Sequence, residues 1–262
     1  MTRLIRVELL KLRTTRLSYG LLATGTGLTV LFSALEALRS GPGKNVGPLY
    51  TASGLNTVVA GGVWALMMAA ILGVTVSSGE FRHSTATLTY LATPHRSRVL
   101  AAKAVAAACA GAVFGLVGYA VAAGTGLVFV AAHGYRVAIG DATLVRYGIG
   151  HILAAALLAA IGVGLGSLIR SQLAAVIGVL VWAIVIESIL GDLFNSIQPY
   201  LPYTAATTLA GTQLGRAAFG PANGAASTAT ALPFAAAAAL LVGVAIVISV
   251  IAALTTVPRD VS

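Results

Sequence analysis

Six long hydrophobic runs constrain the fold of this chain more than any other feature of its sequence. Each run is close to the roughly 20 apolar residues that an α-helix needs to cross about 30 Å of hydrocarbon. The runs are continuous and lack the alternating pattern of strands in a membrane β-barrel. They cover residues 17–38, 57–76, 104–132, 149–169, 173–190 and 234–257. We therefore expect an all-α membrane protein with a single transmembrane domain, residues 17–257, of six spans.

The composition supports a lipid environment. Hydrophobic residues make up 58% of the 262 residues and charged residues only 9%, too few to cover the surface of a soluble domain. The single cysteine, Cys109, excludes a disulfide within the chain. Because Cys109 lies in an apolar run, we expect a buried and inert thiol.

The basic residues fall unevenly about the six spans, and this asymmetry predicts the orientation. With six spans, both termini lie on one side, together with the loops after the second and fourth spans. That side holds eleven basic residues: Arg3, Arg6, Lys11, Arg13, Arg16, Arg82, Arg96, Arg98, Lys103, Arg170 and Arg259. The other side holds five: Arg39, Lys44, Arg136, Arg146 and Arg216. We therefore expect both termini in the cytoplasm, at a bacterial inner or plasma membrane, and we attribute the net charge of +9 to topology rather than to nucleic-acid binding.

Residues 1–16 form a basic amphipathic segment. On a helix, Ile5, Leu9 and Leu12 share one face, and the basic side chains fall largely elsewhere. A helix of this kind lies in the headgroup layer, attracted to anionic lipid. The basic residues of this expected interfacial helix are Arg3, Arg6, Lys11 and Arg13. A cleaved signal peptide is the alternative; against it, Glu8 interrupts a long basic region and no clear cleavage site follows the apolar run.

Residues 77–103 form a polar island between the second and third spans. Ser77 and Glu80 have the spacing of a capping box, which predicts a helix start at the membrane edge. Pro94 ends that helix, because a proline disfavours helical backbone in the residue before it. The pattern therefore predicts a short helix over residues 77–93 that lies across the cytoplasmic face. A solvated loop without a partner is the alternative.

The order of features in the island resembles the first cytoplasmic loop of ABC type-2 exporter permeases. That family shows an acidic–aromatic pair, a threonine, a leucine-rich turn, a Pro-x-Arg element and a lysine at the head of the third span. The matching positions here are Glu80, Phe81, Thr85, Leu88, Pro94, Arg96 and Lys103. The family often has glycine before the threonine, where this chain has Ser84. The basic opening and the six-span layout resemble the family as well.

The resemblance implies a function and a mechanism. Two permease copies, identical or related, pair with two ABC ATPase subunits, and the short cytoplasmic helix enters a groove of the ATPase and couples its movement to the spans. The implied coupling residues are Glu80, Phe81, Arg82, Thr85 and Leu88. No G-x-x-x-x-G-K-[ST] motif occurs in the chain. We therefore expect a transport subunit that is not itself an enzyme, without a cofactor of its own, whose ATP and Mg²⁺ bind to the partner ATPase.

Several residues inside or beside the spans are candidates for further roles. Glu187 in the fifth run is a possible pathway or interface residue, because an isolated charge in a span is costly; a hydrated or protonated carboxyl near the outer end of the helix is the alternative. The lone His151 has no partner in another run, so a haem or metal site is not expected. The glycine pairs Gly111–Gly115 and Gly162–Gly166 have the spacing of close helix packing, which we expect within the chain. Residues 191–233 are too broken for a seventh span and predict an extracellular or re-entrant segment with a short helix.

Two other function classes remain open from the residues alone. An ion-gradient-driven secondary transporter would show charge pairs within the membrane and matched interrupted helices, and the runs show little of either. An intramembrane hydrolase would need a nucleophile and base at membrane depth, and none is visible. The hydrophobic interior suits export of a hydrophobic or amphipathic compound such as a drug, a peptide antibiotic or a lipid.

Overall fold

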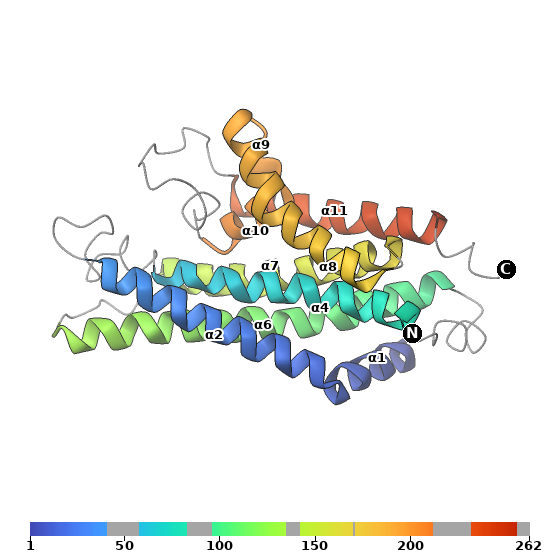
Figure 1. Ribbon diagram of the computed structural model, residues 1–262, viewed down its shortest axis with the longest axis horizontal. Helices are drawn as coiled ribbons and strands as arrows, with labels where there is room; N and C mark the ends of the chain where they lie inside the picture. The colour runs from blue at the N-terminus through green and yellow to red at the C-terminus, as the bar shows by residue number, and fades with distance from the viewer. Residues whose placement is uncertain (41–57, 83–95, 135–141, 170, 212–231, 256–262) are drawn as a thin grey trace.

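The computed structural model is an all-helical bundle (Figure 1). It describes residues 1–40, 58–82, 96–134, 142–169, 171–211 and 232–255. The helices of its first half are α1 (Thr2–Thr14), α2 (Arg16–Arg39), the short 3-10 helix η1 (Ala60–Gly62), α4 (Val63–Arg82) and α6 (Arg96–Ala132). Those of its second half are α7 (Ala142–Leu168), α8 (Gln172–Val181), the π-helix η2 (Trp182–Ile186), α9 (Glu187–Leu193), the 3-10 helix η3 (Gln198–Tyr200), α10 (Pro202–Leu209) and α11 (Phe234–Thr255).

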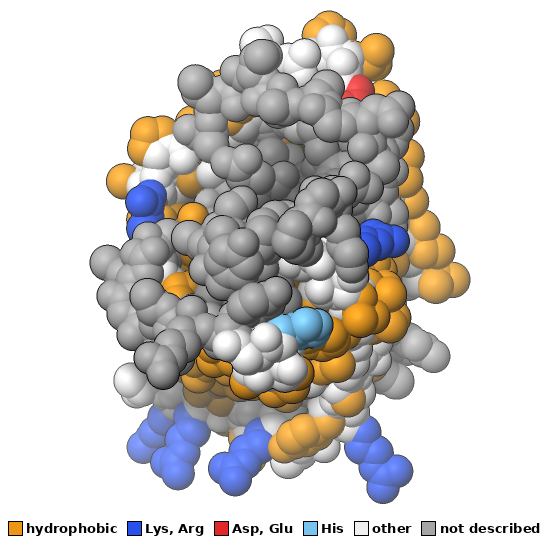
Figure 2. Space-filling model, turned by 90° about the vertical axis from the view of Figure 1, so that its left-hand side faces the viewer, with side chains coloured by type: hydrophobic (Ala, Val, Ile, Leu, Met, Phe, Trp, Pro, Cys, Tyr) orange, Lys and Arg blue, Asp and Glu red, His pale blue; other side chains and the backbone are white. Residues whose placement is uncertain are grey.

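Six helical stretches in the described residues are long and apolar enough to cross a membrane. They are Arg16–Arg39, Ala60–Gly79, Ser97–Ala132, Leu144–Leu168, Gln172–Leu193 and Phe234–Thr255. Each coincides with one of the six hydrophobic runs, so the predicted all-α membrane protein with six spans is confirmed. Hydrophobic side chains lie on the flanks of the bundle, as Figure 2 shows, where lipid would surround a protein of this class.

Spans alternate in direction, so the helix ends gather into two groups (Figure 1). One end of the bundle, which we call the α1 end, carries α1, the last turn of α4, the first turn of α6 and the last turn of α11. The opposite end, which we call the α10 end, carries α10 and the last turns of α2 and α6. This arrangement agrees with the predicted placement of the N-terminal helix and the polar island on one side of the membrane.

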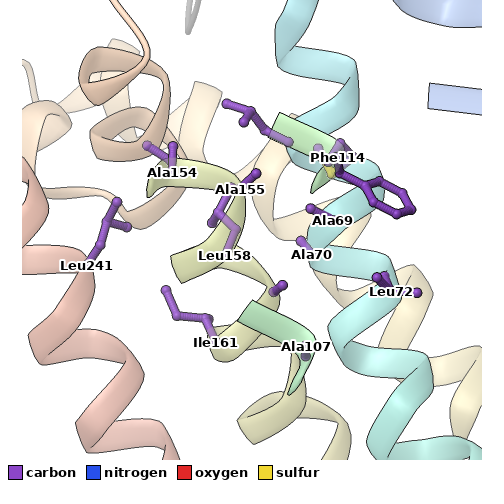
Figure 3. Close-up of a cluster of buried hydrophobic side chains, with 14 of the residues drawn as sticks. Ala69, Ala70, Leu72, Ala107, Phe114, Ala154, Ala155, Leu158, Ile161 and Leu241 are labelled. Carbon is purple, nitrogen blue, oxygen red and sulfur yellow. The ribbon is translucent and has the colours of Figure 1, made fainter. Parts of the chain in front are cut away.

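Small residues let α4, α6 and α7 approach one another closely in the core. Side chains from these helices and from α11 form one buried cluster (Figure 3). A side chain on Gly162 would collide with the backbone of Ala70, and one on Gly166 with that of Val74. Gly111 faces the backbone of Ala155 in the same way. The predicted packing role of the glycine pairs is confirmed, because these helices meet backbone to backbone.

The remaining spans pack more loosely on this core. In the most apolar 18-residue window of each span, 83% of residues are buried for the span that contains α4, but only 17% for the spans of α8–α9 and of α11. Cys109 is exposed on the outer surface of α6, so the expectation of a buried thiol is wrong. An apolar run on a lipid-facing helix carries residues on all its faces, and hydropathy alone does not tell which face is inward.

The structure corrects the predicted helix start at Ser77. Helix α4 runs without a break to Arg82, so Ser77 lies inside a helix rather than at its N-cap. Its hydroxyl lies 2.6 Å from the Ser167 hydroxyl of α7, and Ser78 donates to the Val74 carbonyl at 2.7 Å. The Ser77 side chain therefore links α4 to α7 instead of capping a helix, and a contact between distant residues cannot be read from local spacing. The course of the expected helix beyond residue 82 lies outside the described residues.

The segment between the fifth and sixth spans contains the expected short helix in part. Helix α10 covers Pro202–Leu209, with a proline at its first position, where the missing amide hydrogen costs no bond. Its residues Ala205, Ala206 and Leu209 are buried. The rest of the segment, from residue 212 to 231, lies outside the described residues.

Candidate functional site at the α1 end

The residues expected to couple to an ATPase lie at the α1 end as far as the structure describes them. Glu80, Phe81 and Arg82 form the last turn of α4, and α6 begins at Arg96. Thr85 and Leu88 lie outside the described residues, as do the side chains of Glu80–Arg82. The backbone therefore brings both stems of the polar island to the end that carries α1 (Figure 1).

A buried ion pair joins α1 to the head of α6. The Lys103 ammonium lies 3.5 Å from Glu8 Oε2, and the Lys11 ammonium lies 2.8 Å from Glu8 Oε1. Glu8 is 5% exposed and Lys103 is 3% exposed. Charges at such depth are tolerated when they are paired, because an unpaired buried charge is costly. Glu8 and Lys103 therefore fix the position of α1 on α6.

The buried face of α1 differs in part from the predicted apolar face. Leu12 is buried and Ile5 half-buried, as expected, but Leu9 is exposed and Glu8 takes its place against α6. Glu8 lies one helical turn before Leu12, so the periodicity itself puts it on the inner face. That spacing is the signal that sequence reasoning missed, because Glu8 served there only to argue against a signal peptide.

The outer face of α1 carries the basic residues. Arg3, Arg6 and Arg13 are exposed, and so is Leu10 at 61%. Lys11 is half-exposed and contacts Glu8. This combination of cations and an apolar side chain fits the predicted interfacial helix.

A single extended residue separates α1 from α2. Thr15 has φ −85° and ψ 121°, and its hydroxyl donates to the Lys11 carbonyl at 2.6 Å. Tyr19 of α2 donates through its hydroxyl to the Arg13 carbonyl at 2.9 Å, across the bend. These bonds satisfy carbonyls that the end of a helix leaves open, so the angle between α1 and α2 (Figure 1) is defined locally.

The Ser77–Ser167 contact ties the end of α4 to α7. Both residues are buried, and the Ser167 hydroxyl also donates to the Val163 carbonyl at 2.8 Å. A polar bond inside an apolar helix contact has no water to compete with it. A displacement of the last turn of α4 would therefore reach α7 directly.

The second candidate residue, Glu187, lies at the α10 end and has four hydrogen-bond donors around its carboxylate. Trp182 Nε1 donates to Oε1 at 2.9 Å, and the Tyr203 amide donates to the same oxygen at 2.8 Å. The Thr204 amide donates to Oε2 at 2.8 Å and the Thr204 hydroxyl at 2.9 Å. Glu187 is 3% exposed. Its lone pairs are thus used by this chain, and sequence reasoning named none of the three partners.

Tyr203 extends this network to the core. Its hydroxyl donates to the Val63 carbonyl at the start of α4, at 3.2 Å. Burial, with the nearby Glu187 carboxylate, raises the pKa of the Tyr203 hydroxyl above its usual value. The hydroxyl therefore stays protonated and able to donate to Val63 at every physiological pH.

His151 packs inside the core. It is fully buried on α7, its Nδ1 lies 3.0 Å from the Tyr147 carbonyl, and its ring lies 5.4 Å from that of Tyr119. Gly62 allows this, because a Cβ there would come within 2.7 Å of His151 Nε2. Among the described residues, no group of three or more His, Cys, Asp or Glu side chains could hold a metal ion.

The two candidate sites lie at opposite ends of the bundle and share no described contact. Among their described residues, neither assembles a nucleophile with a base, and each joins separate helices through buried polar groups. Comparison of the chain with protein-family models and with curated proteins finds no match.

Proposed function

We propose that this chain is the transmembrane permease subunit of an ATP-driven ABC exporter. The observation that carries the proposal is the junction at the α1 end. There the stem of α4 that bears Glu80, Phe81 and Arg82, the head of α6 and helix α1 come together. Buried polar contacts join α1 to the head of α6, through Glu8 and Lys103, and the end of α4 to α7, through Ser77 and Ser167. A force applied to the island would enter the most tightly packed helices of the bundle.

The proposed roles follow from the chemistry of the residues. Phe81 and Leu88 supply apolar contacts to a groove of the ATPase, and Thr85 belongs to the same docking surface. Glu80 and Arg82 supply charge complementarity that fixes the orientation of docking. ATP and Mg²⁺ bind to the partner ATPase, which performs the hydrolysis.

The membrane placement forms part of the proposal. Both termini and the island lie in the cytoplasm, as the eleven-to-five division of basic residues favours. Arg3, Arg6, Lys11 and Arg13 hold α1 at anionic headgroups. The complete exporter contains a second permease copy, and its cargo is a hydrophobic or amphipathic compound.

An ion-gradient-driven secondary transporter is the competing function. Its best support would be a free acidic group at membrane depth, and Glu187 is the buried candidate. The four donors around Glu187 all come from this chain, so the described structure favours a structural use of that carboxylate.

The test is co-purification of the tagged chain from its native membrane in mild detergent. We expect an ABC ATPase, recognised by its Walker A sequence and by ATP hydrolysis, to co-elute in a defined ratio. The double substitution Glu80→Ala with Phe81→Ala should reduce the recovered ATPase at least tenfold, since it removes a central apolar anchor and a charge partner.

The matched control also replaces one acidic and one aromatic residue, but in the half of α2 that lies toward the α10 end. Glu36→Ala with Phe32→Ala should leave the recovered ATPase unchanged. A purified chain that transports with an ion gradient and without ATP would contradict the exporter proposal and establish the competing function.

A further inference from the structure

The fifth span is attached to the bundle very differently at its two ends. Helix α8 packs on α4, whereas the larger contacts of α9 among the described residues are with its chain neighbours η2 and η3. Leu193 is 68% exposed and Ile189 is 52% exposed. In Figure 1, α9 accordingly projects away from the long axis of the bundle. The outer half of the span thus stands apart from the core.

A change of helix type marks the joint between the two halves. Residues Trp182–Ile186 form a π-helix between α8 and α9. A π-turn inside an α-helix lacks the regular i to i−4 bonding, and such turns are found mostly at functional positions. The joint therefore lies between α8, which packs on α4, and α9, whose larger contacts are with its chain neighbours η2 and η3.

Glu187, the residue directly after the π-helix, binds the N-terminus of α10. Pro202 is the first residue of α10, so the Tyr203 and Thr204 amides are the second and third of the helix. These are the amides that an N-cap side chain normally satisfies, but the N-cap Leu201 provides no side-chain bond. Glu187 provides it from 16 and 17 residues away in the chain. Its negative charge also suits the positive end of the helix dipole.

Helix α10 is itself fixed to the core. Gly150 of α7 lies so close to the Leu209 carbonyl that a Cβ there would collide with it, and the Tyr203 hydroxyl bonds to the Val63 carbonyl. Leu209 is 1% exposed. The Glu187 carboxylate is therefore a buried polar link between the outer half of the fifth span and the core.

We propose that the fifth span is a hinged arm, with the π-helix Trp182–Ile186 as its pivot and the Glu187–α10 contact as the clasp that holds it closed. Trp182 belongs to the pivot and donates to the carboxylate of the clasp, so the geometry of the pivot and the state of the clasp are coupled. All four bonds end on one carboxylate, so a change at this single side chain weakens them together. The open arm separates α9 from α10 at the α10 end.

The motion of the fifth span belongs to the isolated chain and does not depend on how transport is powered. The hinged arm can therefore be absent from a true exporter, or present in a chain that is not one. The substitution Glu187→Gln tests it with a side chain of the same size. The glutamine amide places an N–H₂ group against N–H donors, which breaks part of the network and removes the charge.

The experiment uses the full chain in lipid nanodiscs and two measurements. Hydrogen exchange of the Tyr203 and Thr204 amides should become roughly tenfold faster or more in Glu187→Gln, because charged hydrogen bonds that protect them are lost. Spin labels at Ile189→Cys on α9 and Val145→Cys on α7, in a Cys109→Ser background, should report a second, longer distance population in the variant. Exchange in α4 and α7 should stay as in the parent protein.

The matched control is Glu36→Gln, which alters a partly buried carboxylate 3.4 Å from Arg39, away from the Glu187 network, and should change neither measurement. Should Glu187→Gln fail to fold, Trp182→Phe and Thr204→Val each remove a single side-chain donor and should each accelerate exchange of the two amides several-fold. Unchanged exchange and distances in the folded variants would overturn the hinged arm. Faster exchange spread equally through α4 and α7 would overturn it as well, since Glu187 would then stabilise the whole fold.

Discussion

At the scale of single residues, a few buried polar groups hold the helices together in a chain of which only 9% of the residues are charged. Glu8 is one of only seven acidic residues, yet it lies between Lys11 and Lys103 at the contact of α1 with α6. A buried ion pair contributes little net stability compared with an apolar pair of the same volume, but a broken one is costly. The main effect of the Glu8–Lys103 pair is therefore to fix the position of α1 on α6.

The substitution Lys103→Met tests this role. We expect the folded chain to lose about 2–4 kcal/mol of stability, because Glu8 stays buried with Lys11 as its remaining cationic neighbour. The double variant Glu8→Gln with Lys103→Met should recover part of that loss, since the contact between α1 and α6 then holds neither the Glu8 nor the Lys103 charge. Thermal unfolding in detergent measures both. Strictly additive losses in the double variant would show that the two side chains do not interact.

At the scale of elements, the helices of the core are held by contacts between backbones. Gly73 of α4 faces the Ala159 carbonyl of α7, and a Cβ would collide with it. Gly178 of α8 has open space where its Cβ would lie. The same substitution at the two positions therefore separates helix packing from helix propensity.

Gly73→Ala should destabilise the fold by about 1–3 kcal/mol or more, because α4 and α7 must move apart. Gly178→Ala should be neutral or stabilising by up to about 1 kcal/mol, since alanine favours the helix and meets nothing. Thermal unfolding of the two variants in detergent measures the difference, and the midpoint of Gly73→Ala should be the lower. Equal midpoints would contradict the close α4–α7 contact.

The sequence predicts the elements better than their ends and partners. Six spans follow from hydropathy, because each apolar run must avoid water whatever it packs against. The start assigned to Ser77 was wrong because its hydroxyl bonds to Ser167, 90 positions away. The break in the fifth span was missed for a similar reason, since Glu187 beside it binds Tyr203 and Thr204 of another helix. Pairings over such distances leave no local pattern.

At the scale of the whole molecule, the two proposed functions lie at opposite ends of the bundle: ATPase docking at the α1 end and the hinged arm at the α10 end. At the α1 end, buried polar contacts join α1 to α6 and α4 to α7, and the α10 end carries the proposed clasp on the fifth span. The core of α4, α6 and α7 connects the two ends as closely packed helices. In the proposed exporter, movement that enters at the island would travel along this core toward the clasp.

In the proposed exporter, the island of residues 77–103 docks onto an ATPase. The most direct measurement places a photoreactive amino acid at Leu88 in cells that express the full chain, with the same amino acid at the exposed Ala132 as control. We expect a covalent adduct with an ABC ATPase from position 88 and none from position 132. Adducts from position 88 with lipid alone, or with no ATP-hydrolysing protein, would contradict it.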